Sequence, residues 1–209
     1  MGRPHPARQR ATTLSTATLA SSLSLVSSTS YLIATQLFVN SGVTLTIASG
    51  TSIYAIPTNS SVAPAIVVLK GGALMATGTA SQPITFTSVL AESALVSSAR
   101  ASTDSNENAI TLGERGKWGG LILLGNAPTN MPTIEGITGY TYGGTVATES
   151  SGFWKYVRVW HCGAFVGANN EVNGYTFGGV CSGTVIDHCE AAFNLDDGFE
   201  IFGGTVNVK

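Results

Sequence analysis

Short runs in which apolar and polar residues alternate recur along the chain. In "VTLTI" (43–47) the apolar Val43, Leu45 and Ile47 take every second position, with threonines between them. Alternation with a period of two is typical of a β-strand that is buried on one face. Similar β-rich runs, mostly bounded by Gly, Pro or Asn, follow at 65–72, 83–88, 120–126, 155–163 and 183–192. The pattern therefore predicts an all-β protein.

A repeat accompanies these runs. The dipeptide Gly-Gly occurs at 71–72, 119–120, 143–144, 178–179 and 203–204, at intervals of 48, 24, 35 and 25 residues. The segments "NGYTFGGV" (173–180) and "DGFEIFGGT" (197–205) also share one order of turn residue, aromatic residue and Gly-Gly. Short strands with such a period predict a right-handed parallel β-helix, a solenoid of six or seven coils of about 24 residues each, from about residue 35 onward.

The alternation also assigns side chains to the two faces of each strand. One face must fill the narrow interior of the solenoid, and the other meets solvent. We expect Arg158 and Glu200 to point outward. The interior positions are predicted to include Val157, Val159, Ile186, Phe199 and Ile201.

The predicted domain organisation is a leader followed by one β-helix. Residues 1–30 are basic and then rich in Ser, Thr, Ala and Leu, which is typical of a targeting segment or a disordered leader. Residues 31–209 are assigned to the β-helix, with an insertion near 88–113 that contains the best helix candidate, 88–101. The chain has no run of 18 apolar residues, so we predict no transmembrane span.

Charge and cysteine content narrow the function classes. Charged residues make up 11% of the chain and the net charge is −2, so the chain lacks the basic surface of a nucleic-acid binder. No Asp or Glu precedes Glu92, which leaves residues 1–91 at +4 and residues 92–209 at −6. The three cysteines, in "WHC", "VCS" and "DHC", are expected to fill core positions rather than to bind zinc.

Several blocks of the sequence resemble a known bacterial family. The blocks are "GVTLTIASGTSI", "GGALMATGTASQPITFTS", "GKWGGLILLGNAPTN" and "NEVNGYTFGGVCSGTVIDHCEAAFNLDDGFEIFGGTVNVK", within residues 31–209. They look like secreted or surface-anchored parallel β-helix proteins of the pectin-lyase-like fold, including spirochaete outer-membrane lipoproteins and Bacteroidetes secreted proteins. The resemblance implies an extracellular or cell-surface location and no assigned activity. The N-terminus departs from the lipoproteins, because it has no lipobox-like Cys.

The end of the sequence carries a further expectation. After "FEIFGG" come only "TVNVK" and no capping segment, although an open strand edge promotes aggregation. We therefore expect the natural polypeptide to continue beyond Lys209, or a partner to cover this edge.

The acidic cluster in "NLDDGFEI" allows three interpretations. Asp197-Gly198 suits the turn that opens a strand, which makes the carboxylates structural. Asp196, Asp197 and Glu200 could instead hold calcium, since hard oxygen ligands suit that ion. A catalytic role is the third interpretation, but adjacent aspartates on a strand face opposite ways.

Two classes of function follow. The first is a structural or glycan-binding surface module without catalysis, in which Trp118, Arg158 and Trp160 contact polysaccharide or envelope components. The second is a polysaccharide lyase or glycoside hydrolase, with Arg158 as the candidate base of a calcium-dependent lyase. His161 and His188 are interpreted as ordinary strand residues. Ice binding through Thr44/Thr46 and Thr85/Thr87 is a weaker third idea, because the threonines do not recur in every coil.

Overall fold

The fold is known from a computed structural model that describes residues 11–58, 62–91, 115–167 and 170–209. Within these residues, strands form three parallel six-stranded sheets, here named A, B and C. Sheet A contains β1 (Ala11–Thr13), β4 (Ser30–Ile33), β7 (Ser52–Ala55), β10 (Ile84–Ser88), β13 (Val157–Trp160) and β18 (Glu190–Ala192). Sheet B contains β2 (Thr18–Leu19), β5 (Gln36–Val39), β8 (Ala65–Val68), β11 (Leu121–Leu124), β16 (Tyr175–Val180) and β19 (Phe199–Gly204). Sheet C contains β3 (Leu23–Leu25), β6 (Thr44–Ile47), β9 (Ala73–Thr77), β12 (Gly152–Lys155), β17 (Val185–Asp187) and β20 (Asn207–Val208).

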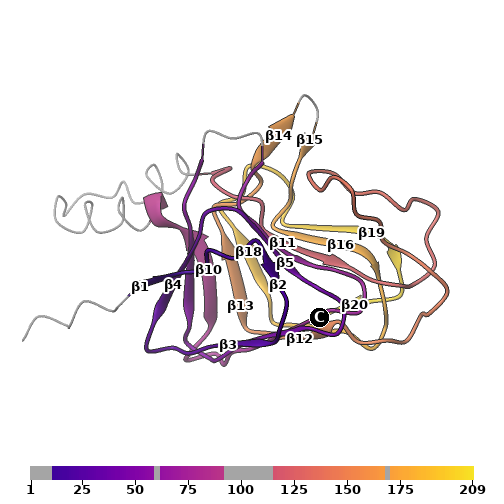
Figure 1. The fold of residues 1–209 in the computed structure, drawn as a ribbon, viewed down its shortest axis with the longest axis horizontal. Coiled ribbons are helices and arrows are strands. Elements are labelled where there is room, and N and C mark those ends of the chain that lie inside the picture. Colours follow the sequence, from indigo (N-terminus) through magenta and orange to yellow (C-terminus); the bar gives the residue numbers. More distant parts are fainter. Residues whose placement is uncertain (1–10, 59–61, 92–114, 168–169) are drawn as a thin grey trace, which may run out of the picture.

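The chain visits the three sheets in turn, A then B then C, and each visit to all three completes one coil (Figure 1). Every strand of the three sheets pairs in parallel with the equivalent strand of the next coil. The described residues therefore form six coils of a right-handed parallel β-helix, and the predicted fold is confirmed. A short antiparallel hairpin, β14 (Phe165–Gly167) with β15 (Asn170–Glu171), interrupts the fifth coil.

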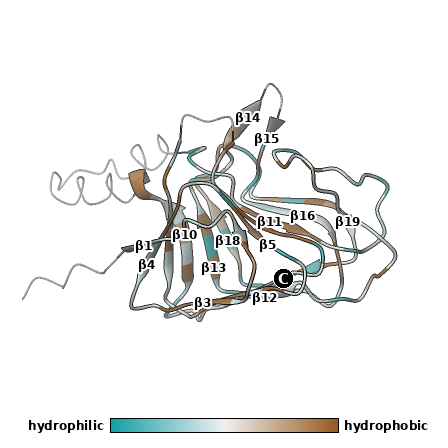
Figure 2. Ribbon diagram, viewed as in Figure 1, coloured by the Kyte–Doolittle hydropathy of each residue, from teal (hydrophilic) through white to brown (hydrophobic). Residues whose placement is uncertain are grey.

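The alternation of apolar and polar residues explains which side chains enter the solenoid. Leu45 and Ile47 on β6 are buried in the core, while Thr46 between them is exposed. The predicted interior residues Val157, Val159 and Ile186 are each at most 1% exposed. Figure 2 shows hydrophobic residues distributed along the strands of all three sheets. Burial of this apolar stripe in every coil supplies the main driving force for folding.

The ordered coils begin earlier than the sequence predicted. Residues 11–30, assigned to a leader, contain β1, β2 and β3, which pair with β4, β5 and β6. Leu19 and Leu25 from this segment lie in the core. The Ser- and Thr-rich composition suggested a leader, but Ser and Thr equally suit the outward positions of a strand. Residues 1–10 lie outside the described part of the chain.

Two predicted interior residues of the last described coil are exposed. Phe199 and Ile201 stand opposite the buried Tyr175 and Phe177, so they do point to the interior side of sheet B. However, β19 is the last strand of this sheet in the described residues, and Phe199 is 37% and Ile201 54% exposed. The prediction was therefore correct about the direction of these side chains and wrong about their burial.

A long connection covers the outer face of sheet B. Residues 126–150, here called the excursion, leave the solenoid after β11 and return at β12, and they form the loops beside β16 and β19 in Figure 1. Ile134, Ile137 and Tyr142 of the excursion form a second apolar cluster with side chains of the sheet. The sheet side of this cluster consists of Ala65, Val67, Ile122 and Leu124. Strands β8 and β11 are consequently buried on both faces.

The insertion predicted near 88–113 falls largely outside the described structure. The segment 88–113 lies between β10 and β11, and residues 92–114 are not among those described. Among the residues that are described, no helix has the length and apolar character needed to cross a membrane.

Candidate functional site

The outer face of sheet A carries Arg158 and Trp160 on β13, in the fifth of the six described coils. Strand β13 alternates, so Val157 and Val159 are buried while Arg158 and Trp160 point outward and are half-buried. Strand β18 of the following coil pairs with β13 and places Glu190 opposite Arg158. Two neighbouring coils therefore build this surface together.

Glu190 is held by both of its carboxylate oxygens. The Nε of Arg158 lies 3.3 Å from Oε2 of Glu190, and Nε1 of Trp160 donates a 2.9 Å hydrogen bond to Oε1. The guanidinium carbon of Arg158 also lies 5.6 Å from the centroid of the Trp160 ring, within the range of a cation–π interaction. The ionic side chains are 38% and 48% exposed, so their pairing contributes little to stability. The three residues form a unit with no net charge that offers donors, acceptors and an aromatic plane.

Residues with left-handed backbone conformations flank both strands. Tyr156 (φ 51°) and His188 (φ 52°) occupy equivalent corners on the N-terminal side, and their ring centroids lie 4.7 Å apart. His161 (φ 63°) and Phe193 (φ 57°) occupy the corners on the C-terminal side, with centroids 5.1 Å apart. Positive φ is uncommon and strained for residues other than glycine. The two histidines are therefore corner residues stacked between coils, and the prediction that they are ordinary strand residues is wrong.

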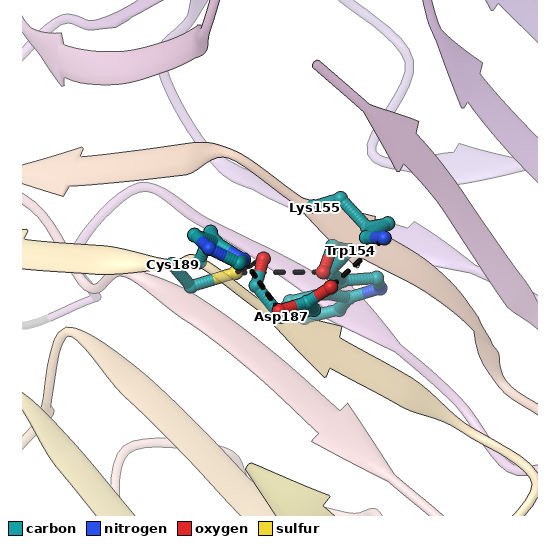
Figure 3. Close-up of polar contacts among 5 residues, drawn as sticks. Trp154, Lys155, Asp187 and Cys189 are labelled. Carbon is teal, nitrogen blue, oxygen red and sulfur yellow. Dashed lines mark hydrogen bonds and ion pairs between the residues drawn. The ribbon is translucent and has the colours of Figure 1, made fainter. Parts of the chain in front are cut away.

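A second ion pair lies at the corner between sheets C and A (Figure 3). The Nζ of Lys155 lies 2.8 Å from Oδ2 of Asp187, and Nδ1 of His188 lies 2.5 Å from Oδ1. The hydrogen bond from Lys155 lowers the pKa of the Asp187 carboxyl below its ordinary value, and His188 lowers it further. In turn, the hydrogen bond to Asp187 raises the pKa of the Lys155 ammonium. Beside this pair, the Sγ of Cys189 contacts the backbone oxygen of Trp154 at 3.6 Å.

A small cavity opens beside these groups. Its volume is about 190 Å³, and it is lined by Ala80, Pro83, Tyr156, Arg158, His188 and Glu190. This is below the roughly 300–1,000 Å³ that is typical of sites that engulf a small molecule. Glu190 is the one carboxylate among these described lining residues. The cavity therefore suits contact with part of a larger ligand that lies along the sheet.

Comparison with known proteins assigns the family. A family model described as a pectate-lyase-like β-helix domain matches residues 17–98 and 103–209, which is most of the chain. The chain belongs to this family. Searches of curated proteins and of solved structures gave no match.

Trp118, the third predicted ligand residue, lies inside the pectate-lyase-like β-helix. It is 1% exposed and its ring lies near that of Phe86, with centroids 6.2 Å apart. Its Nε1 donates a 2.8 Å hydrogen bond to the backbone oxygen of Trp160. The ring is thus closed to a ligand at the surface, contrary to the prediction, because this position faces the interior just before β11.

The predicted metal ligands do not converge. Asp196 and Asp197 are exposed in the turn before β19, whereas Glu200 turns toward Asn173 and accepts a hydrogen bond from its Nδ2. Burial raises the pKa of the Glu200 carboxyl; the bond from Asn173 opposes this rise, and Glu135, Asp196 and Asp197 add to it. In the described part of the chain, no group of three His, Cys, Asp or Glu side chains is placed to hold a metal ion. Calcium binding stays a prediction from the sequence.

The cysteines of the β-helix domain are free thiols. Cys162 and Cys181 are fully buried and Cys189 is partly buried, as expected for small core residues. Burial raises the pKa of all three thiols, most strongly that of Cys162. Since the thiolate is the reactive form, these groups are poorly suited to nucleophilic chemistry.

Sequence reasoning missed Glu190 and the corner pair of Tyr156 and His188. The two His-Cys dipeptides, in "WHC" (160–162) and "DHC" (187–189), are not equivalent in the structure, where Trp160 pairs with Ala192. The register of β12 with β17 places Lys155 against Asp187, and the register of β13 with β18 places Arg158 against Glu190. Both pairs have the same sequence separation. Two complementary charge pairs at one spacing were therefore the signal that could have revealed the site.

Proposed function

We propose that the protein is a glycan-binding module of the pectate-lyase-like β-helix type, and that the outer face of sheet A in the fifth and sixth coils binds an uncharged polysaccharide chain. The observation that carries this proposal is the unit of Arg158, Trp160 and Glu190. Sugar hydroxyls both donate and accept hydrogen bonds, and the carboxylate and guanidinium supply both kinds of partner side by side. The half-buried ring of Trp160 supplies an apolar plane with a polar edge, which suits the less polar face of a sugar ring.

Charge balance favours an uncharged chain. Arg158 is paired with Glu190, and Lys155 with Asp187, so both of these cations lie within 3.3 Å of a carboxylate oxygen. A carboxylated or sulfated sugar placed here would meet Glu190 and Asp187 as well as the cations. Repulsion between the anionic group of such a sugar and these two carboxylates would oppose binding.

Binding without hydrolysis is favoured over glycosidase activity. A glycoside hydrolase uses two carboxyl groups about 5–9.5 Å apart on either side of the scissile bond. The described lining of the cavity contains Glu190 and no second carboxylate. Glu190 is moreover engaged by Arg158 and Trp160 through both oxygens.

The test is binding of soluble neutral polysaccharides, such as xyloglucan, mannan and laminarin, measured by affinity electrophoresis and calorimetry. We expect Trp160→Ala to weaken binding about tenfold, which corresponds to about 1.4 kcal/mol. Glu190→Gln should also weaken it, because the amide no longer pairs with Arg158. The matched control is Thr46→Ala, an exposed outward position on sheet C that should leave binding unchanged. Failure of the wild-type protein to bind any of these polymers, or equal binding by the Trp160 variant, would contradict the proposal.

A secreted or cell-surface location is part of this proposal. It is supported by the resemblance to surface and secreted β-helix proteins and by the composition, in which charged residues make up 11% and Gly reaches 25 residues. We expect the native protein in the extracellular or envelope fraction after cell fractionation and immunoblotting. Recovery in the cytosolic fraction would count against it.

A further inference from the structure

A second, larger cavity lies where the excursion meets the second and third coils. Its volume is about 500 Å³, within the range of about 300–1,000 Å³ for small-molecule sites. Asn40 and Ser41 follow β5, and Leu69 and Lys70 follow β8, so one wall is formed by the corners that lead from sheet B toward sheet C. The facing wall is a short run of the excursion, Gly139, Tyr140 and Thr141.

Three contacts fix the excursion over these coils. The Nε2 of Gln36 donates a 3.1 Å hydrogen bond to the backbone oxygen of Gly136. The ring of Tyr140 stacks on Phe38, with centroids 4.8 Å apart and an interplanar angle of 29°. The Nζ of Lys70 lies 3.4 Å from the backbone oxygen of Gly143, a long hydrogen bond. The cavity is thus framed by groups that are already held in place, which reduces the entropy that a ligand must overcome.

The described lining of the cavity carries positive charge only. Lys70 is the one charged residue in its described lining, and no carboxylate lines it. Residues 11–91, which include the first three coils and β10 of the fourth, contain no Asp or Glu. Among the described residues no ion pair joins Lys70 to a carboxylate. In the described residues the lining therefore carries the positive charge of Lys70 without a carboxylate to balance it. Lys155 on sheet C and Arg158 on sheet A, in contrast, are each paired with a carboxylate.

The other lining groups complement a sugar. Tyr140 is 36% exposed although one side of its ring is stacked on Phe38, so part of the aromatic surface remains open. Asn40 offers an amide that both donates and accepts, and Ser41 and Thr141 offer hydroxyls. An aromatic plane, short polar groups and one cation together match a ring that carries hydroxyls and one anionic substituent.

We propose that this cavity is a binding site for an acidic saccharide, with a sugar ring against Tyr140 and its carboxylate or sulfate on Lys70. The site shares no residue with the outer face of sheet A, so it does not depend on the function proposed above. Together the two sites would let one molecule hold an uncharged chain on one side and an acidic one on another.

The test uses the full chain and three probes in calorimetric titrations: a galacturonic acid tetrasaccharide, a heparin-derived tetrasaccharide and maltotetraose. At least one acidic probe should bind. In the Trp160→Ala variant, whose neutral site on sheet A is weakened, maltotetraose should bind at least tenfold more weakly than that acidic probe. The first two probes show whether the anion is a carboxylate or a sulfate. Raising the salt from about 0.05 to about 0.5 M should weaken acidic binding several-fold, because salt screens charges near a surface.

Matched variants assign the binding to this cavity. Lys70→Met keeps much of the aliphatic stem and removes the charge, and we expect at least a tenfold loss of acidic binding. Lys70→Arg keeps the charge and should retain most of it, while Tyr140→Ala should weaken it. Trp160→Ala on sheet A should leave acidic binding unchanged while it weakens neutral binding. No binding of either acidic probe at millimolar concentration, or full acidic binding by Lys70→Met, would overturn the proposal. Equal binding of maltotetraose and the acidic probes by the Trp160→Ala variant would also overturn it.

Discussion

Replacing Trp154 with alanine is expected to lower the free energy of unfolding by about 3 to 5 kcal/mol, the range found for large aromatic side chains in cores. Trp154 lies inside the solenoid with no exposed surface, and its ring is 6.0 Å from that of Tyr175 and 5.9 Å from that of Phe177. Truncation would leave a void that spans neighbouring coils. The rigid strands on all sides cannot close it, because their register fixes the spacing between coils. Equilibrium denaturation in urea measures the change.

Two further variants separate packing from polar effects. The Nε1 of Trp154 is buried and has no hydrogen-bond partner among the described residues, which itself costs free energy. Trp154→Phe removes this donor and keeps an aromatic ring, so it should destabilise the protein by clearly less than Trp154→Ala. Trp160→Ala, at a half-buried outward position, should cost less than about 1 kcal/mol. Equal losses for Trp154→Ala and Trp160→Ala would show that the interior is not packed as described.

Gly152→Ala should destabilise the protein by about 3 kcal/mol or more, although it adds a single methyl group. Gly152 begins β12 with a φ of 124°, which side chains of L-residues rarely adopt. A Cβ at this position would overlap the backbone oxygen of Leu74, its partner in β9, and would lie 2.7 Å from the Leu74 carbonyl carbon. Backbone atoms inside a sheet cannot move aside without breaking ladder hydrogen bonds. Thermal and urea denaturation should both register the loss.

Gly42 provides the matched control for this substitution. Its φ of 74° is also positive, but nothing lies within 4 Å of the Cβ that a substitution would add. Gly42→Ala should therefore show the conformational cost alone, about 1–2 kcal/mol. If the two variants were equally stable, the close approach between β9 and β12 would not be the cause of the effect.

The fold was predictable because strand alternation depends only on local sequence. The spacing of Gly-Gly dipeptides, in contrast, led to the correct fold for a partly mistaken reason. Gly71-Gly72 lies between β8 and β9, Gly119-Gly120 precedes β11, and Gly143-Gly144 lies in the excursion. These positions are not equivalent, and even Gly178 stands opposite Phe202 rather than a glycine. Among the intervals considered, the one from Asn173 to Asp197 matches the register of β16 with β19.

The candidate site could not be assembled from the predicted 24-residue period because the length of a coil varies. Leu45 pairs with Leu23 of the preceding coil and with Leu74 of the following coil. More residues separate Leu45 from Leu74 than from Leu23. Corners accept extra residues while the strands keep their pairing, so no single period aligns the whole chain. A period of about 24 residues therefore does not align Arg158 with Glu190 or Lys155 with Asp187, and the spacing shared by these two charge pairs is the sequence signal of their local register. The outward direction of Arg158 needed no register, and it was predicted correctly.

The same variation in corner length has a consequence for how the molecule unfolds. In a simple solenoid each coil touches only its neighbours, so the ends can fray independently. Here the excursion leaves the fourth coil and reaches back to the second, where Gln36 bonds to Gly136 across 100 residues of sequence. The excursion thus connects two coils that are not adjacent and couples their stability. Loss of the second coil would remove this hydrogen bond and Phe38, which packs against the apolar cluster on sheet B. Partial unfolding from the N-terminal side therefore carries a penalty that stacking alone would not impose.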